Sequence, residues 1–190
     1  MNFQDNLVIC ALTKADVRFE MNVDQEIYNI VDENDFIIGK ASRKYIHQNK
    51  LLHRSVHILV FNSKKELFLQ KRALCKDECP GLWDTSTAGH VDAGETYLGC
   101  AHREIFEELN LKVFLVPSIK ISACNDTHGE HVQVYTCINN DPVKINPREI
   151  SEGKFFNLLE IKENISINPD QFTSSFKLIF NQILNNEIKY

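Results

Sequence analysis

The first half of the chain alternates short apolar runs with polar turns, a pattern typical of antiparallel strands. Residues 26–31 and 36–39 form one such pair of apolar runs and predict a hairpin. Residues 56–62 and 66–72 form a second pair, and they predict the strongest strand pair in the chain.

Later apolar runs predict the remaining strands and two helices. Strands are expected at four further places: 85–91, 113–123, 131–138 and 154–159. Polar or irregular connections are expected at 73–86, 125–130 and 141–152. Ser42 is expected to cap a short helix over 42–48. Asn168-Pro169-Asp170 predicts a helix start, because proline fits the first turn. That helix is expected to bury one apolar face, formed by Phe172, Phe176, Ile179 and Ile183.

A further amphipathic helix follows the glycine-punctuated loop 89–95 and runs to Leu111. At about 100° per residue, taking Glu104 as zero places Glu107 at about −60° and Glu108 at about +40°. The three carboxylates therefore share one stripe of the helix. Arg103 lies one turn before Glu107, well placed to pair with it. A neighbouring apolar stripe is expected to face the core, and its members are Leu98, Ala101, Ile105 and Leu109.

Clustered carboxylates raise one another's pKa, so they are costly without cations. Oxygen ligands on a rigid helix suit a hard divalent ion such as Mg²⁺ or Mn²⁺. A solvated acidic helix face is the alternative, and the charge pattern alone favours it. The spacing of the residues around the three carboxylates decides between a metal-binding stripe and a solvated acidic face.

Composition places the 190-residue chain among ordinary globular proteins of one domain. A formal net charge of −5 without a basic cluster argues against a nucleic-acid partner. No basic amino-terminal region precedes the short apolar run 7–12, which argues against a signal peptide or membrane span. The six cysteines are expected to be reduced thiols in a cytoplasmic protein. Residues 1–25 are expected to form an arm or extra strand, packed on the body or on a second subunit of a homodimer.

The spacing from the glycine loop through the acidic helix resembles the Nudix box of the Nudix hydrolase superfamily. It consists of a Gly, five residues, Glu, seven residues, and then Arg-Glu-apolar-any-Glu-Glu-any-Asn-apolar, from Gly89 to Leu111. Every fixed position matches except Asn110, where the family has Gly. Asn tolerates the left-handed conformation at a helix end, so the change should cost little stability. The match makes a metal-binding stripe the better interpretation of the three carboxylates.

Three further segments resemble the branch of Nudix proteins related to isopentenyl-diphosphate isomerase. They are 52–62, Gln70-Lys71-Arg72-Ala73 and Pro80-Gly81-Leu82-Trp83-Asp84. With the box, the likeness covers residues 26–165, within a Nudix hydrolase domain that spans 26–190. It implies an α+β fold, the Nudix α/β/α sandwich, with a curved mixed sheet between helices and the box helix lining a cleft.

The branch contains isomerases and hydrolases, and one position favours hydrolysis. The isomerases carry a catalytic Cys directly before the Gly-His that opens the box, and this chain has Ala88 there. Ala can neither donate nor accept a proton, and allylic isomerisation needs an acid and a base. The nearest thiols in the sequence, Cys79 and Cys100, lie elsewhere in the pattern. Two alternatives stay open: an isomerase-like activity and a non-catalytic diphosphate-binding module.

The isomerases also hold a metal on three histidines and downstream glutamates. His53 and His90 match two of these positions and predict a second metal site. His47 lies one residue off the third spacing, and Glu130 is a loose match for an acidic ligand. Strand-end histidines that bond to backbone are the alternative, and they are the commoner case. Cys75 and Cys79 lack a partner pair with zinc-site spacing and are expected to be buried apolar residues. Trp83 is expected in the core or cleft wall, with base stacking as the alternative.

The resemblance implies a small-molecule diphosphate substrate, with a nucleoside-diphosphate derivative the commonest kind. Glu104 and Glu108 are the expected ligands of Mg²⁺, joined by Glu107 directly or through water and by the carbonyl of Gly89. A metal-bound water would attack phosphorus while the ions neutralise charge on the leaving oxygens. Glu95 and Arg103 are expected to position these groups. The general base stays open among Glu104, Glu107, Glu130 and Glu149.

Overall fold

The computed structural model describes residues 26–185, and the arm predicted for residues 1–25 lies outside them. Within that range the elements follow one another as β1 (Ile27–Val31), β2 (Ile37–Ser42), α2 (Arg43–Gln48), β3 (His53–Phe61), β4 (Leu67–Arg72), β5 (Trp83–Asp84), β6 (Thr87–His90), α3 (Tyr97–Leu109), β7 (Val116–Ile121), β8 (Glu130–Ile138), β9 (Ile150–Phe156), α4 (Leu158–Ile167), a 3-10 turn (Pro169–Gln171) and α5 (Ser174–Asn185).

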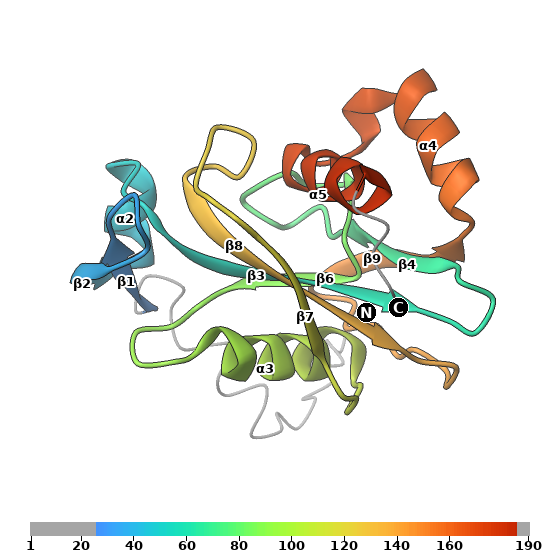
Figure 1. Ribbon diagram of the computed structural model, residues 1–190, viewed down its shortest axis with the longest axis horizontal. Helices are drawn as coiled ribbons and strands as arrows, with labels where there is room; N and C mark the ends of the chain where they lie inside the picture. The colour runs from blue at the N-terminus through green and yellow to red at the C-terminus, as the bar shows by residue number, and fades with distance from the viewer. Residues whose placement is uncertain (1–25, 186–190) are drawn as a thin grey trace, which may run out of the picture.

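A seven-stranded mixed sheet forms the centre of the part described. Its main path runs β5-β4-β3-β8-β7, with β6 paired to β3 and β9 paired to β4. The β3–β8 pair is parallel over nine residues of each strand, and the other pairs are antiparallel. The hairpin of β1 and β2 packs with α2 beyond one end of the sheet (Figure 1).

Helices cover both faces of the sheet (Figure 1). On one face α3 buries Ala101, Ile105 and Leu109 against Val56 and Ile58 of β3. On the other face α5 and α4 close a second core around Phe176, Phe180 and Ile161. This arrangement confirms the predicted α+β sandwich with a curved mixed sheet between helices.

The predicted strand pair of residues 56–62 and 66–72 forms, but its ladder is short. Strands β3 and β4 share the register pair Phe61↔Leu67, and then they separate. Ser86 fills the gap: Val60 N donates to Ser86 Oγ at 2.8 Å, and Ser86 Oγ donates to the carbonyl of Phe68 at 2.5 Å. The separation lets β6 pair with the other half of β3, which places the start of the glycine loop in the sheet.

The carboxyl-terminal part differs from the prediction at the last strand. Strand β9 begins at Ile150, within the predicted polar connection 141–152, and it ends at Phe156. The expected continuation to residue 159 is wrong, because Asn157 caps a helix, α4, that the apolar pattern did not predict. The final helix is confirmed, with Phe176, Ile179 and Ile183 buried on α5, but its predicted start at Asn168-Pro169-Asp170 is wrong, because residues Pro169–Gln171 form a separate 3-10 turn and α5 begins at Ser174.

Smaller elements agree with the sequence more closely. The hairpin of 26–31 and 36–39 is confirmed as β1 and β2. Ser42 caps α2 by accepting a hydrogen bond from Tyr45 N at 3.3 Å. Within residues 26–185 no helix combines the length and apolar character needed to cross a membrane.

Candidate functional site

Both ends of helix α3 are fixed by local hydrogen bonds, and the end at Asn110 was predicted. Thr96 Oγ1 accepts a hydrogen bond from Gly99 N at 3.0 Å and caps the amino terminus. Asn110 lies in the left-handed region at φ 55°, and its N–H closes the last turn. Asn110 therefore does what glycine does in the family motif. Leu98 was expected in the core but is 45% exposed, and the neighbouring Tyr97 packs against the core instead.

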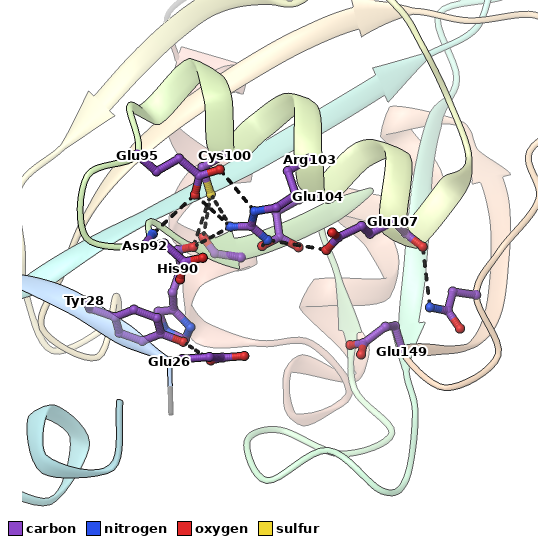
Figure 2. Close-up of polar contacts among 12 residues, drawn as sticks. Glu26, Tyr28, His90, Asp92, Glu95, Cys100, Arg103, Glu104, Glu107 and Glu149 are labelled. Carbon is purple, nitrogen blue, oxygen red and sulfur yellow. Dashed lines mark hydrogen bonds and ion pairs between the residues drawn. The ribbon is translucent and has the colours of Figure 1, made fainter. Parts of the chain in front are cut away.

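Arg103 is the centre of the polar contacts along α3 (Figure 2). Its guanidinium holds Glu95 with two bonds of 3.1 and 2.9 Å, and it also contacts Glu104 and the carbonyl of His90. The predicted pair with Glu107 forms at 3.5 Å. Bidentate Arg–carboxylate contacts fix geometry as well as charge. Glu95 and Arg103 thus anchor the glycine loop to the acidic helix.

Glu108 is the buried carboxylate of the stripe, and Glu104 is nearly buried, with 12% of its side chain exposed. Burial raises the pKa of Glu104 well above its usual range, and the neighbouring Glu108 adds to the effect. Burial also raises the pKa of Glu108 to about 7. Gln70 Nε2 donates to Glu108 Oε2 at 3.2 Å. Glu107 is different, since 45% of its side chain is exposed at the rim. Two largely buried carboxylates with raised pKa values form a site that a cation would stabilise.

The backbone of Gly89 lies directly against the carboxylate of Glu104 and belongs to the same site. A Cβ on Gly89 would lie 2.0 Å from Glu104 Oε1, so any other residue at this position would displace the carboxylate of Glu104. The oxygens of Glu104, Glu107 and Glu108, with the carbonyl of Gly89, form the carboxylate site. All of its donors are oxygens, as Mg²⁺ and Mn²⁺ prefer. The donor types suit a hard divalent ion, but within residues 26–185 only two groups bring three ligand atoms within 4.8 Å of one another, and both contain histidine.

Three histidines from separate segments form a second cluster. The ring centroids of His47, His53 and His90 are each 5.1 Å from the other two. His90 Nε2 lies 3.0 Å from Glu130 Oε1, and His53 Nε2 lies 3.6 Å from the same oxygen. These four residues are called the histidine site. The structure thus brings His47 and Glu130 to the predicted pair His53 and His90.

The histidine site also fits a metal ion. Burial lowers the pKa of His53 to about 4, so its ring is neutral at pH 7, as a ligand must be. Burial alone would raise the pKa of Glu130, but His90 and His53 hold it well below its usual range. A metal about 2.1 Å from each ring nitrogen, at tetrahedral angles, would place the ring centroids about 5 Å apart. Imidazole nitrogens suit transition metals such as Zn²⁺, Co²⁺ or Ni²⁺ better than Mg²⁺.

One cleft joins the carboxylate site to the histidine site. It is lined by α3, by β6 and by two connecting segments, the β4–β5 loop (residues 73–82) and residues 144–149. Arg72 and Lys76 bring positive charge to the wall, where they pair with Asp84 and Glu149. Glu149 lies across from the carboxyl-terminal half of α3, near Glu107 (Figure 2). Among the predicted base candidates, Glu149 and Glu130 therefore lie in different halves of the cleft.

Ala88 lines the cleft on β6, two residues before His90, so the two side chains lie on the same face. Its register partner on β3 is His57, which is 4% exposed and contacts Thr85 Oγ1 at 2.8 Å. Burial lowers the pKa of His57. Cys100 is buried against the carbonyls of Gly89 and His90. The position before Gly89 thus has no ionisable side chain of its own.

Three expectations about single side chains have clear outcomes. Cys75 is exposed and Cys79 partly exposed, so the prediction that both are buried apolar residues is wrong. They lie on the irregular β4–β5 loop, where no strand or helix carries them into the core. Trp83 is confirmed in the core at 9% exposure, packed edge-on against Phe156. Glu78 was missed; it reaches His47 from the same loop, and no motif marks it.

Known proteins resemble this chain over most of its length. The family model of the NUDIX domain matches residues 51–176. Isopentenyl-diphosphate Delta-isomerase 2 of Photorhabdus laumondii is 35% identical, covering 86% of this chain and 96% of that protein. The Delta-isomerase of Pectobacterium atrosepticum is 34% identical, covering 81% and 89%. An uncharacterized Nudix hydrolase of Pseudomonas aeruginosa is 33% identical, covering 70% and 79%.

Solved structures agree on the fold. A crystal structure of DR0079 from Deinococcus radiodurans has a TM-score of 0.74 at 24% identity, covering 83% of this chain and 98% of that one. The MutT protein of Methanosarcina mazei has a TM-score of 0.57 at 21% identity, covering 71% and 94%. The carboxylate of Glu104 on α3, which packs over Gly89, agrees with the match to the NUDIX domain model and with the relatives. This chain belongs to the Nudix hydrolase superfamily.

Proposed function

We propose that the protein is a divalent-metal-dependent hydrolase that cleaves the phosphoanhydride bond of a small diphosphate-linked substrate, such as a nucleoside-diphosphate derivative. The observation that carries the proposal is the pair Glu104 and Glu108, largely buried on the cleft side of α3 with raised pKa values. Such a pair is costly in a protein that never binds a cation there. A bound Mg²⁺ or Mn²⁺ would supply the positive charge that admits a diphosphate and would acidify the attacking water.

The chain's own residues provide the rest of the site. Arg103 orients Glu104 and Glu107 while Glu95 holds the guanidinium from the other side. Arg72 and Lys76 give the cleft wall the positive charge that attracts the substrate anion. Glu149, which pairs with Lys76, is the favoured general base, because it lies across from α3 in the half of the cleft with the carboxylate site (Figure 2), whereas Glu130 lies at the histidine site. In this scheme Glu107 at the exposed rim joins the cation directly or through water.

Isomerisation of isopentenyl diphosphate is the second candidate function. Two observations favour it: the histidine site, and the names of the Photorhabdus and Pectobacterium relatives. Ala88 opposes it, because the position expected to hold the acid–base thiol cannot move a proton. A non-catalytic diphosphate-binding module is the third candidate, but the carboxylate site has lost none of the residues that the Nudix motif requires for metal binding.

One set of assays separates the three candidates. The protein with Mg²⁺ is given nucleotide sugars, dinucleotides, nucleoside triphosphates, coenzyme A and prenyl diphosphates, and released phosphate or mononucleotide is measured. Isopentenyl diphosphate is followed separately for conversion to its dimethylallyl isomer. We expect metal-dependent hydrolysis of at least one substrate and no isomerisation. Isomerisation that is lost on chelation would overturn the proposal, and binding without any turnover would favour the non-catalytic module.

A further inference from the structure

The β4–β5 loop reaches the histidine site through Glu78. The carboxylate Oε1 of Glu78 lies 2.9 Å from His47 Nδ1, and 41% of the Glu78 side chain is exposed. The backbone carbonyl of Glu78 accepts a hydrogen bond from Arg72 Nε at 3.0 Å. The β4–β5 loop therefore contacts helix α2 at His47, one of the three clustered histidines.

This contact decides which nitrogen of His47 can bind a metal. An Nδ1–H that donates to Glu78 leaves the lone pair on Nε2. The Nε2 atoms of His47 and His53 are buried and have no hydrogen-bond partner within residues 26–185. His53 is held in the same way, since its Nδ1 lies 3.0 Å from the carbonyl of Leu51. Both rings thus keep an unused buried nitrogen, and His53 is only 3% exposed.

Oriented imidazoles of this kind are typical of metal sites, where the second ring nitrogen donates to a carboxylate or carbonyl. We propose that Glu78 is a positioning residue of the histidine site: it holds His47 in the ligating tautomer, and a transition metal bound there fixes the β4–β5 loop over the cleft. Glu78 acts in this proposal through His47, and a carboxylate oxygen of Glu78 also lies within 4.8 Å of ligand atoms of His90 and Glu130. The proposal holds whether the cleft hydrolyses or isomerises its substrate.

The loop also reaches the carboxylate site. Lys76, two residues before Glu78, pairs with Glu149, the acid that faces α3. Glu78 and Lys76 therefore connect one short segment to both halves of the cleft. Filling the histidine site would hold the loop, and with it the Lys76–Glu149 pair, in one position.

A cobalt titration of the full chain tests the positioning role. Excess Mg²⁺ is included to occupy the carboxylate site, and the visible absorption of Co²⁺ reports imidazole ligation. We expect Glu78→Gln to weaken Co²⁺ binding by about 10- to 100-fold, the usual cost of losing an orienting partner. Asp77→Asn is the matched control, because Asp77 ties the same loop to Arg43 of the same helix without touching a histidine. It should bind Co²⁺ like the unmodified protein, and His47→Gln should lose the band.

Hydrogen exchange of the loop amides tests the coupling. We expect Co²⁺ to slow exchange across residues 73–82 in the unmodified protein and in Asp77→Asn, but not in Glu78→Gln. Equal Co²⁺ affinity in Glu78→Gln and the unmodified protein would overturn the proposal. Equal weakening by Asp77→Asn and Glu78→Gln would overturn it too, because the loop would then act as a general tether. These readouts need no substrate, so they stand apart from the outcome of the hydrolase assays.

Discussion

Glu108 combines two properties at the scale of a single residue. It lies beside the apolar stripe of α3, 6% exposed, yet its carboxylate accepts from Gln70 and faces the cleft. A buried carboxylate in such a position contributes to cation binding at the expense of stability without the cation. The same side chain is therefore expected to be needed for activity and unfavourable for the metal-free fold.

Glu108→Gln should lower kcat by at least about 100-fold, because an amide is a poor ligand for a hard cation. The metal-free variant should melt no lower than the unmodified protein, since the change removes a buried charge without changing shape. Glu107→Gln, at the exposed rim, should lose less activity. Thermal unfolding with chelator and turnover at saturating Mg²⁺ measure both effects. A Glu108→Gln enzyme of normal activity, or one that melts far below the unmodified protein, would contradict the assignment.

The raised pKa of Glu108 also predicts a pH dependence of stability. The unfolded carboxyl has its ordinary pKa of 4.5, and the folded one has a pKa of about 7. Between these values the folded protein binds the extra proton, so this group's contribution to stability falls as pH rises from about 5 to about 7 and is constant above. The melting temperature of metal-free Glu108→Gln minus that of the unmodified protein should therefore increase over this range. Glu163→Gln, an exposed carboxylate on α4, should show no such trend.

At the scale of the element, α3 shows why one helix could be predicted nearly completely. Its charge stripe, its buried Ala101, Ile105 and Leu109, and its Asn110 end all follow from local spacing. Helix α4 could not be predicted in the same way. Phe155-Phe156-Asn157-Leu158-Leu159 is one apolar run broken by a single Asn, and the sequence does not show that this Asn caps a helix instead of continuing a strand. Tertiary packing of Ile161 against the second core decides it.

Asn110 gives a test confined to this element. Because Asn110 has φ 55°, Asn110→Ala should destabilise the protein by about 1 kcal/mol, the cost of the left-handed region for a residue with a Cβ. Asn110→Gly should be neutral or slightly stabilising, since glycine adopts this conformation freely. Denaturant unfolding of the two variants measures the difference. Alanine and glycine variants of equal stability would show that the helix end does not depend on this conformation.

At the scale of the whole molecule, the two sites differ in how far the sequence predicted them. The carboxylate site lies within 20 residues of the chain, so spacing alone brought Gly89, Glu104 and Glu108 together. The histidine site draws on α2, β3, β6 and β8, and its assembly depends on the parallel pairing of β3 with β8, which places His53 opposite Glu130. No local pattern encodes that pairing. Glu78 was harder still to predict, because it lies on the irregular β4–β5 loop, which has neither strand nor helix periodicity.

The layout of the whole cleft also predicts which bond of the substrate breaks. In the proposed hydrolysis, the carboxylate site and the basic side chains of Arg72 and Lys76 would surround the diphosphate and would stabilise charge that develops on phosphate oxygens. Attack at the carbon of a sugar or prenyl group would need stabilisation of a carbocation, and the carboxylate site provides none. Hydrolysis in ¹⁸O-labelled water should therefore place the label in a phosphate-bearing product, as mass spectrometry of the products would detect. Label on the alcohol or sugar product would show that water attacks carbon, and the roles given to Glu104, Glu107 and Glu108 would then be wrong even though the chain is a Nudix protein.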